Sequence, residues 1–263
     1  MQVETVGTGT PDVAVVGALH GDEPCGARAI QRFLADDHDV RRPAKLIIAN
    51  ERALRKDVRY VETDLNRAIP GDPESTLYEE RLAHELMQEI EGCTALGIHS
   101  TVSYPEAFAN VANATANDHE LVSRLPVSKV VDFSAVADGR CVELPGFVDV
   151  EAGLQRTEQA AENAYDCIVR FLRALDVLPG TAPSTSTARY EVFEAVEKER
   201  GRPYRFHGEN FERIPEGEVF AESGDRELRA DREFWPVLMS DDGHSTLLGY
   251  KSTRTGPLDA AEP

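Results

Sequence analysis

The stretch Val13-Ala14-Val15-Val16-Gly17-Ala18-Leu19-His20-Gly21-Asp22-Glu23 decides how the chain folds. Its first part is a continuous apolar run, which predicts a buried strand over residues 13–18. Polar residues follow at once, and His20 and Glu23 stand three positions apart where the strand gives way to a loop. Imidazole nitrogen and carboxylate oxygen both bind zinc well, and a catalytic zinc site uses three protein ligands. The stretch therefore suggests two zinc ligands, with a solvated loop as the plainer alternative.

The third candidate ligand is His99, which closes another short apolar run at residues 96–99. Two further strand ends carry polar groups, because Asn50 follows a predicted strand at 45–49 and Glu151 follows one at 147–150. Ligands of open α/β sheets bind beyond the carboxyl ends of the strands. The four strand ends therefore predict one site, a hydrolytic zinc centre held by His20, Glu23 and His99.

The rest of the chain indicates an α/β fold followed by a small β-rich part. Amphipathic helices are predicted at 24–34, 75–90, 117–125 and 157–175, and they alternate with strands at 13–18, 45–49, 95–98, 127–131 and 147–150. This alternation predicts a mixed central sheet flanked by helices. A Pro/Ser/Thr-rich run at 179–187 has the composition of a linker, and short alternating apolar runs follow it. We expect a catalytic domain at 1–178, a linker at 179–187, a C-terminal all-β domain at 188–254 and a disordered tail at 255–263.

Composition limits the partners that the protein can have. The chain has 263 residues and a formal net charge of -19, with 47 acidic against 28 basic residues. Such a surface repels nucleic acid and anionic lipid, so neither is expected as a partner. Only five of the basic residues are lysine, and an acidic, lysine-poor surface resembles the cytosolic proteins of halophilic archaea. The alternative is an ordinary acidic enzyme.

Localisation is expected to be cytoplasmic. The four cysteines form no C-x-x-C motif and no disulfide framework. The N-terminus has neither the basic start nor the apolar core of a signal peptide. No run of about 18 apolar residues predicts a membrane span.

Three motifs, taken together in their order and spacing, resemble a known family. They are G-x-x-H-G-x-E at residues 17–23, D-L-N-R at 64–67, and the strand end Ile98-His99-Ser100. The combination is similar to the succinylglutamate desuccinylase and aspartoacylase family, part of the zinc carboxypeptidase-like superfamily. The similarity extends over residues 13–155, and Glu151 in V-E-A-G fits the V-E-x-G segment of that family. The resemblance implies a zinc carboxypeptidase-like fold.

The resemblance also implies roles for individual residues. His20, Glu23 and His99 match the three ligands of one zinc ion per chain. Glu151 matches the general base that takes a proton from the zinc-bound water, and Arg59 matches the guanidinium that polarises the scissile carbonyl. The chemistry agrees, since zinc supplies hydroxide at neutral pH and a carboxylate relays the proton to the leaving amine.

Asn66 and Arg67 match the pair that holds a substrate carboxylate, which a planar guanidinium can bind with two parallel hydrogen bonds. The implied function is a zinc-dependent amidohydrolase that cleaves the amide bond of a small anionic N-acyl amino acid. The alternatives are a zinc carboxypeptidase acting on peptides and a non-catalytic member of the fold.

The sequence departs from the family pattern at several positions. Members commonly carry Asp two residues before the third ligand, where this chain has Gly97. We therefore expect a carboxylate that orients His99 to be missing and zinc to be held more loosely. Arg156 fits substrate binding and a surface ion pair equally well. Tyr250 is expected to be a strand residue and not the tyrosine of the pocket, and Asp64 to fix its loop through an Asx-type bond.

Overall fold

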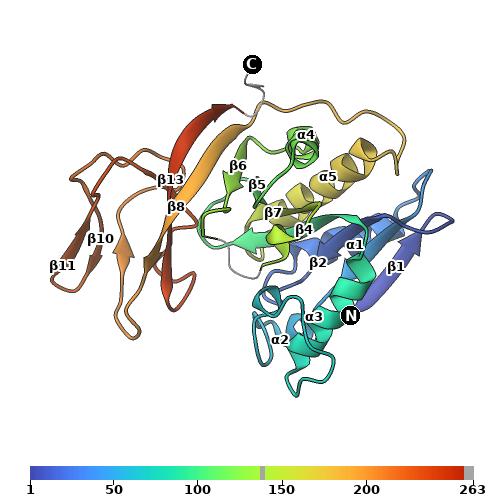
Figure 1. Ribbon diagram of the computed structural model, residues 1–263, viewed down its shortest axis with the longest axis horizontal. Coiled ribbons are helices and arrows are strands. Elements are labelled where there is room, and N and C mark those ends of the chain that lie inside the picture. Colours follow the sequence, from blue (N-terminus) through green and yellow to red (C-terminus); the bar gives the residue numbers. More distant parts are fainter. Residues whose placement is uncertain (137–139, 258–263) are drawn as a thin grey trace.

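A computed structural model of the chain describes residues 1–136 and 140–257 (Figure 1). Its centre is a ten-stranded sheet in the order β1-β3-β2-β4-β7-β5-β6-β8-β13-β12. The strands are β1 (Gln2–Val6), β2 (Val13–Gly17), β3 (Ala44–Ile48), β4 (Thr94–Thr101), β5 (Phe108–Val111), β6 (Lys129–Asp132), β7 (Phe147–Leu154), β8 (Ala188–Glu197), β12 (Trp235–Val237) and β13 (Leu247–Pro257). Parallel pairs join β3, β2, β4 and β7, whereas β5 runs antiparallel to β7. The sheet is therefore mixed, as predicted.

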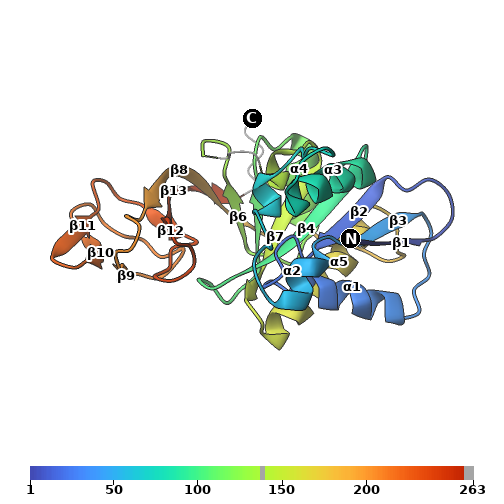
Figure 2. The ribbon, with the colours of Figure 1, turned by 90° about the horizontal axis from the view of Figure 1, so that it is seen from below.

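Helices cover both faces of the α/β part. They are α1 (Cys25–Ala35), α2 (Glu51–Lys56), α3 (Tyr78–Ile90), α4 (Ala116–Arg124) and α5 (Glu158–Ala174), with short 3-10 turns η1 (Leu65–Arg67) and η2 (Cys141–Glu143). Residues of α1, α4 and α5 share one hydrophobic core with one face of β2, and α3 shares a second core with the other face. Figure 2 shows α1 and α5 side by side. A strand buried on both faces needs apolar residues at every position, which explains the unbroken run that begins at Val13.

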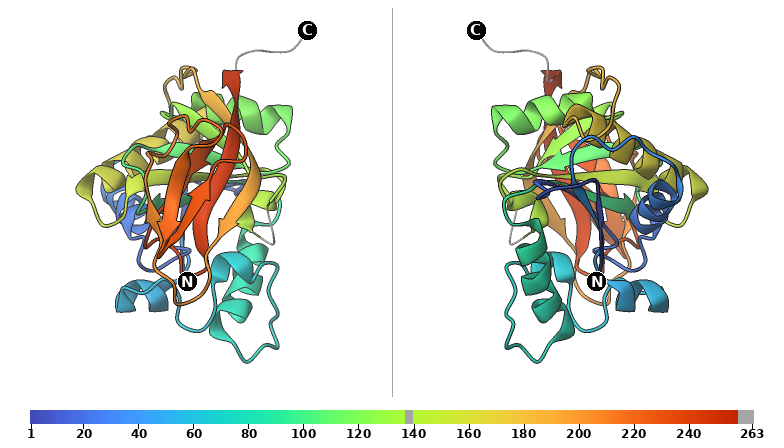
Figure 3. Two further views of the ribbon diagram at one scale, coloured as in Figure 1. Left: turned by 90° about the vertical axis from the view of Figure 1, so that its left-hand side faces the viewer. Right: turned by 90° about the vertical axis from the view of Figure 1, so that its right-hand side faces the viewer.

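The C-terminal segment extends the main sheet as well as forming a sheet of its own. β8 pairs in parallel with β6, and β13 and β12 follow beyond it. A second, three-stranded sheet consists of β9 (Arg205–Phe206), β10 (Val219–Ser223) and β11 (Arg226–Arg229). Figure 3 (left) looks onto these C-terminal strands, which lie in front of the α/β part. The small C-terminal β sheet was expected, whereas the continuation of the central sheet into β8, β13 and β12 was not.

Several elements differ from the prediction. The structure adds β1, β5 and α2, for which no prediction was made, and the third helix begins at Tyr78 and not at residue 75. β13 continues to Pro257, into the segment for which we expected a disordered tail. Residues 258–263 lie outside the described residues. The domain boundaries at 178 and 188 stay predictions. Among the described residues no helix is long and apolar enough to cross a membrane.

Candidate metal centre and active site

The loop after β2 carries two of the predicted ligands. Ala18 takes a left-handed backbone conformation (φ 54°), which is unusual for a residue other than glycine and turns the chain sharply out of the strand. A Cβ at Gly21 would lie 2.0 Å from the carbonyl carbon of Ala53, so only glycine lets the loop pack directly on α2. Held in this way, His20 and Glu23 both turn inward and are only 3% and 4% exposed.

The third ligand and the predicted base lie on adjacent strands. His99 is near the end of β4, and the parallel register pairs it with Glu151 on β7. Registered residues of neighbouring strands point to the same side of a sheet. Glu151 therefore lies beside His99, and its Oε2 is buried without a hydrogen-bond partner among the described residues.

The three predicted ligands form a compact buried cluster. Nδ1 of His20 lies 2.8 Å from Glu23 Oε1, and Nδ1 of His99 lies 2.9 Å from Glu23 Oε2. One ligand atom from each residue falls within 4.8 Å of the others. Two imidazoles and a carboxylate are the donor set that zinc takes in hydrolytic sites. The cluster thus fits a metal ion of this kind by its chemistry as well as by its spacing.

Burial and mutual attraction shift the titration of these groups. Burial alone would raise the pKa of Glu23, but His20 and His99 outweigh it and hold that pKa well below its usual value. The pKa of Glu151 is raised to about 7. Burial is the largest cause, Glu23 and Asp149 also raise this pKa, and His99 opposes them. A carboxyl group that titrates near neutrality, next to a candidate metal cluster, has the pKa that a general base requires.

Arg59 and Asp64 surround the cluster from the loop that follows α2. Arg59 Nη1 donates to Glu23 Oε1 at 3.2 Å, and Arg59 Nε donates to Asp64 Oδ2 at 3.0 Å. Asp64 Oδ1 accepts from the backbone N–H of Asn66, which is the expected Asx-type bond. The same oxygen lies 3.1 Å from Nε2 of His20. Asp64 therefore does more than shape its loop, because it also fixes the ring of His20.

Asn66 and Arg67 point toward the same pocket. Asn66 Oδ1 accepts the backbone N–H of Cys141 at 2.9 Å, which leaves its Nδ2 group free to donate. Arg67 makes no ion pair within the described part of the chain, although the protein is strongly acidic. Burial lowers the pKa of Arg67, and the neighbouring Arg140 lowers it further. Two guanidinium groups, those of Arg67 and Arg140, thus lie close together at the pocket.

All seven predicted site residues line one pocket of about 270 Å³. The C-terminal segment closes part of it with residues that the sequence analysis did not assign to a site: His244, Leu247, Leu248 and Tyr250. Tyr250 lies on β13 as predicted, but its hydroxyl also accepts a hydrogen bond from Arg140 Nη2 at 2.6 Å. Tyr250 is therefore a strand residue, as predicted, and it also lines the pocket, where it was not expected. Arg140 and His244 belong to no sequence motif, so there was no reason to place them at the site from the sequence.

Two other expectations are decided by the geometry. Arg156 pairs with Asp57 at 2.9 Å on the exposed surface and does not line the pocket. The expectation that no carboxylate stands behind His99 is wrong, because Asp149 Oδ1 lies 3.4 Å from Nε2 of His99. That carboxylate comes from the adjacent strand β7. The sequence expectation considered only the position two residues before His99, on the strand of His99 itself.

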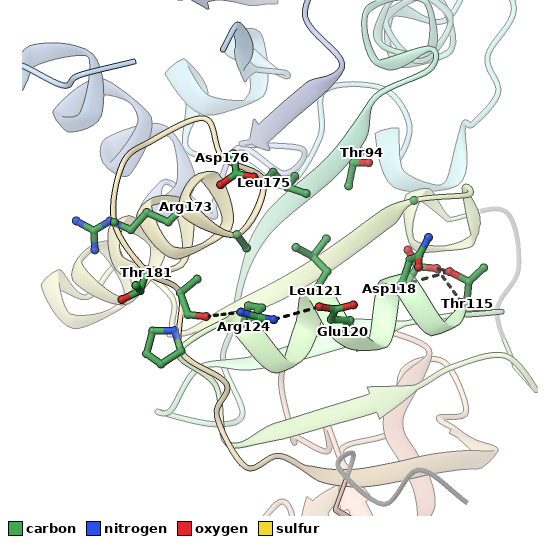
Figure 4. A pocket seen from close by; sticks show the side chains of 16 residues that line it. Thr94, Thr115, Asp118, Glu120, Leu121, Arg124, Arg173, Leu175, Asp176 and Thr181 are labelled. Atoms are coloured by element: carbon green, nitrogen blue, oxygen red, sulfur yellow. Dashed lines mark hydrogen bonds and ion pairs between the residues drawn. The ribbon is translucent and has the colours of Figure 1, made fainter. Parts of the chain in front are cut away.

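A larger cavity of about 820 Å³ lies elsewhere, between α4, the end of α5 and residues 180–183 (Figure 4). Three of the charged side chains that line it make hydrogen bonds to groups beside them. Arg124 donates to Glu120 and to the carbonyl of Ala182, and Asp118 accepts from Thr115. It contains none of the predicted site residues, so the smaller pocket is the candidate active site.

Comparison with known proteins finds a similar catalytic domain over part of the chain. Residues 9–120 match the model of the succinylglutamate desuccinylase/aspartoacylase catalytic domain. An N-acyl-aromatic-L-amino acid amidohydrolase (carboxylate-forming) from Xenopus laevis is 35% identical over 86 residues, which are 29% of this chain and 28% of that protein. The chain thus matches under a third of the length of this curated relative.

Solved structures share the fold over nearly the whole chain. A succinylglutamate desuccinylase/aspartoacylase from Rhodobacter sphaeroides has a TM-score of 0.76 at 20% identity, covering 99% of this chain and 89% of that one. A product-bound ectoine utilization protein from Ruegeria pomeroyi has a TM-score of 0.75 at 17% identity, covering 97% and 88%. These similarities establish the fold.

The fold and the buried cluster define the class of protein: a mixed α/β protein with a candidate metal centre at the carboxyl edge of its sheet. Within it, residues 9–120 are similar to the catalytic domain of the succinylglutamate desuccinylase/aspartoacylase family.

Proposed function

We propose that this protein is a zinc-dependent amidohydrolase that cleaves the amide bond of a small N-acyl amino acid carrying a carboxylate. The observation that carries the proposal is the buried His20–Glu23–His99 cluster with Glu151 beside it, whose Oε2 has no hydrogen-bond partner in the described part of the chain. Both lie in one pocket with Arg59 and with the guanidinium pair of Arg67 and Arg140. A non-catalytic member of the fold would have no need of this combination.

His20, Glu23 and His99 would hold the zinc ion. Bound zinc lowers the pKa of water and polarises a carbonyl group, which is the chemistry that amide hydrolysis needs at neutral pH. The two imidazoles can serve as neutral ligands through Nδ1, since each Nδ1 already faces Glu23. Their Nε2 atoms face Asp64 and Asp149, which can accept the remaining ring proton.

Glu151 is proposed as the general base. Its carboxyl takes a proton from the attacking water and passes it to the amide nitrogen that leaves as an amine. A pKa of about 7 makes it able both to accept and to return that proton near neutrality. Arg59 is proposed to stabilise the negative charge that develops on the carbonyl oxygen, because its guanidinium lies at the edge of the cluster, in contact with Glu23.

The pocket is suited to an anionic substrate. Asn66 Nδ2 and Arg67 are proposed to bind a substrate carboxylate, and Arg140 adds a second guanidinium close to Arg67. In a chain of net charge -19, local positive charge that has no ion pair is costly unless an anion neutralises it. The arginines therefore favour N-acyl amino acids as substrates, because these carry a carboxylate. A substrate with a second carboxylate should bind still better.

The C-terminal segment weighs against a carboxypeptidase acting on long peptides. His244, Leu247, Leu248 and Tyr250 come from this segment and narrow the pocket to about 270 Å³. Such a volume lies just under the lower end of the range for small-molecule sites and leaves little room for an extended chain. We therefore place the peptidase second.

A substrate panel tests the proposal. The zinc-loaded protein is incubated with N-acetyl and N-succinyl derivatives of acidic, aromatic and neutral amino acids, and release of the free amino acid is measured. A second set contains peptides of three to five residues. We expect hydrolysis of the N-acyl amino acids and not of the peptides. Removal of the C-terminal residue from the peptides, with no reaction of the small substrates, would establish the carboxypeptidase instead.

A further inference from the structure

The ring nitrogen of His99 that faces away from the cluster points at a carboxylate from another strand. Nδ1 of His99 is turned toward Glu23, whereas Nε2 lies 3.4 Å from Oδ1 of Asp149. We propose that Asp149, on the neighbouring strand β7, is the residue that positions His99 for metal binding. This inference rests on the metal centre of the proposed function.

The strand register explains how Asp149 reaches this place. β4 and β7 are parallel neighbours, and Gly97 on β4 pairs with Asp149 on β7. Two positions further along the same strands, His99 pairs with Glu151. Residues two apart on a strand share a face, so Gly97, His99, Asp149 and Glu151 all point to the same side of the sheet. A side chain on Gly97 and the side chain of Asp149 would then occupy neighbouring space.

Gly97 leaves that space empty, and Asp149 fills it. A Cβ at Gly97 would lie 1.9 Å from Oδ1 of Asp149 and 2.8 Å from Cε1 of Phe147. Any larger residue at position 97 would therefore displace the carboxylate. Glycine inside a buried strand often marks a close approach of another group, and here the group is a carboxyl oxygen. The glycine on β4 thus makes room for the carboxylate that comes from β7.

The two facing atoms of the pair, Asp149 Oδ1 and His99 Nε2, are buried. The side chains of Asp149 and His99 are 5% and 6% exposed. Neither Asp149 Oδ1 nor His99 Nε2 has another hydrogen-bond partner among the described residues. A separation of 3.4 Å is longer than an ordinary hydrogen bond, but it is within the range of an ion pair. A buried carboxylate without a partner is costly, so the His99 ring is the group that can offset that cost.

The contact defines what Asp149 does. A carboxylate behind Nε2 keeps the ring proton on that nitrogen, so that Nδ1 presents its lone pair to the metal. His20 has the same arrangement, because its Nε2 lies 3.1 Å from Asp64. Asp149 is thus a positioning residue that acts through His99, and its loss should weaken metal binding before it changes the chemical step. Loss of such a partner typically costs about 10–100-fold in metal affinity.

Relocating the carboxylate provides the test. Zinc affinity is measured by competition with a chromogenic chelator for wild type, Asp149→Asn, Asp149→Gly and the exchange variant Gly97→Asp/Asp149→Gly, with folding checked by circular dichroism. We expect Asp149→Asn and Asp149→Gly to lose about 10–100-fold in affinity. The exchange variant should recover most of that loss, because its carboxylate again stands behind His99. The exposed change Asp57→Asn serves as the control and should leave affinity unchanged.

The outcomes separate the inference from the proposed function. Wild-type protein that binds no zinc would overturn the metal centre itself. Wild-type protein that binds zinc, together with folded Asp149→Asn that binds it equally tightly, would overturn only the role of Asp149. An exchange variant that is folded but no tighter than Asp149→Gly would also overturn that role, since the carboxylate would then not act by its position behind His99.

Discussion

Glu23 holds the candidate centre together at the scale of single residues. Its two carboxylate oxygens contact His20 and His99, and they also accept hydrogen bonds from Arg59 and from the backbone N–H of Ser100. A carboxylate with this many donors stays ionised well below its usual pKa. The site is therefore organised by the chain itself, which reduces the cost of ordering ligands when a metal binds.

The base role of Glu151 predicts a pH dependence. Only the ionised carboxylate can accept a proton, and its pKa is raised to about 7. The value of kcat/KM should therefore rise with pH and level off at about pH 7. If zinc bound at the cluster lowers the pKa of Glu151, the plateau begins at a lower pH. Glu151→Gln should keep zinc and lose at least about 100-fold in turnover, together with this acid limb. Near-normal turnover with an unchanged limb would assign the base to another group.

The two predicted arginines should have different kinetic signatures. Arg67 is proposed to bind a substrate carboxylate that is present before and during the reaction, so Arg67→Ala should raise KM by at least about 10-fold with little change in kcat. Arg59 is proposed to meet charge that exists only as the bond breaks, so Arg59→Ala should lower kcat more than it raises KM. A carboxamide analogue of the substrate provides the control. If wild type turned it over as well as the acid, Arg67 would not bind a carboxylate.

At the scale of elements, the buried strands were predictable and their neighbours were not. β2 and β3 are continuous apolar runs because both faces are covered, and α1, α3 and α5 show the helical period of a half-buried helix. β1 is an edge strand with exposed residues, and β5 has only four residues inserted between β7 and β6. Their pairing depends on distant strands, which a local pattern does not contain.

Some residues of the candidate site could also be predicted from the sequence, and others could not. His20, Glu23 and His99 follow apolar runs, so their position at strand ends could be read from the sequence. Arg140 and Tyr250 are 110 positions apart and meet only because β13 joins the main sheet. Gly97 did carry a signal, since glycine within a strand indicates a close approach, but the sequence does not say which group approaches.

The loop before β13 is predicted to control access to the pocket. Lys198 is buried, and its ammonium donates to the carbonyl oxygens of Asp241 and His244. Lys198→Met removes these bonds while keeping the length of the side chain, so the loop that carries His244 should loosen and KM should rise about 3- to 10-fold. Lys251→Met is the matched control, because Lys251 is also buried but pairs with Glu194 and Asp231. An equal KM in the two variants would mean that the loop does not shape the pocket.

At the scale of the whole molecule, charge is distributed unevenly. The chain carries a net charge of -19, yet Arg59, Arg67 and Arg140 gather at one pocket. Two of the five lysines, Lys198 and Lys251, are buried, which leaves the surface still poorer in lysine than the composition suggests. The same pocket is also lined by carboxyl groups, those of Asp22, Glu23, Asp149, Glu151 and Asp242. The three arginines can therefore attract an anionic substrate only at short range.

The acidic surface predicts a stability that depends on salt. Repulsion among the carboxylates is screened as ionic strength rises, so the melting temperature should increase from low to molar KCl. A chain of this size gains about 2–4 °C for each kcal/mol of repulsion that is removed. Thermal unfolding followed by circular dichroism measures the change. A melting temperature that stays flat or falls over this range would contradict a halophilic origin.

Zinc titration of the metal-free protein tests the proposed hydrolysis most directly. Protein stripped of metal is given increasing zinc, and the initial rate on its best N-acyl amino acid substrate is recorded beside the same titration of a His20→Ala/His99→Ala variant. We predict no activity without metal, a rise that is complete at about one equivalent per chain, and no response in the variant. Full activity of the stripped protein, or an equal rise in the variant, would contradict a zinc centre at His20, Glu23 and His99.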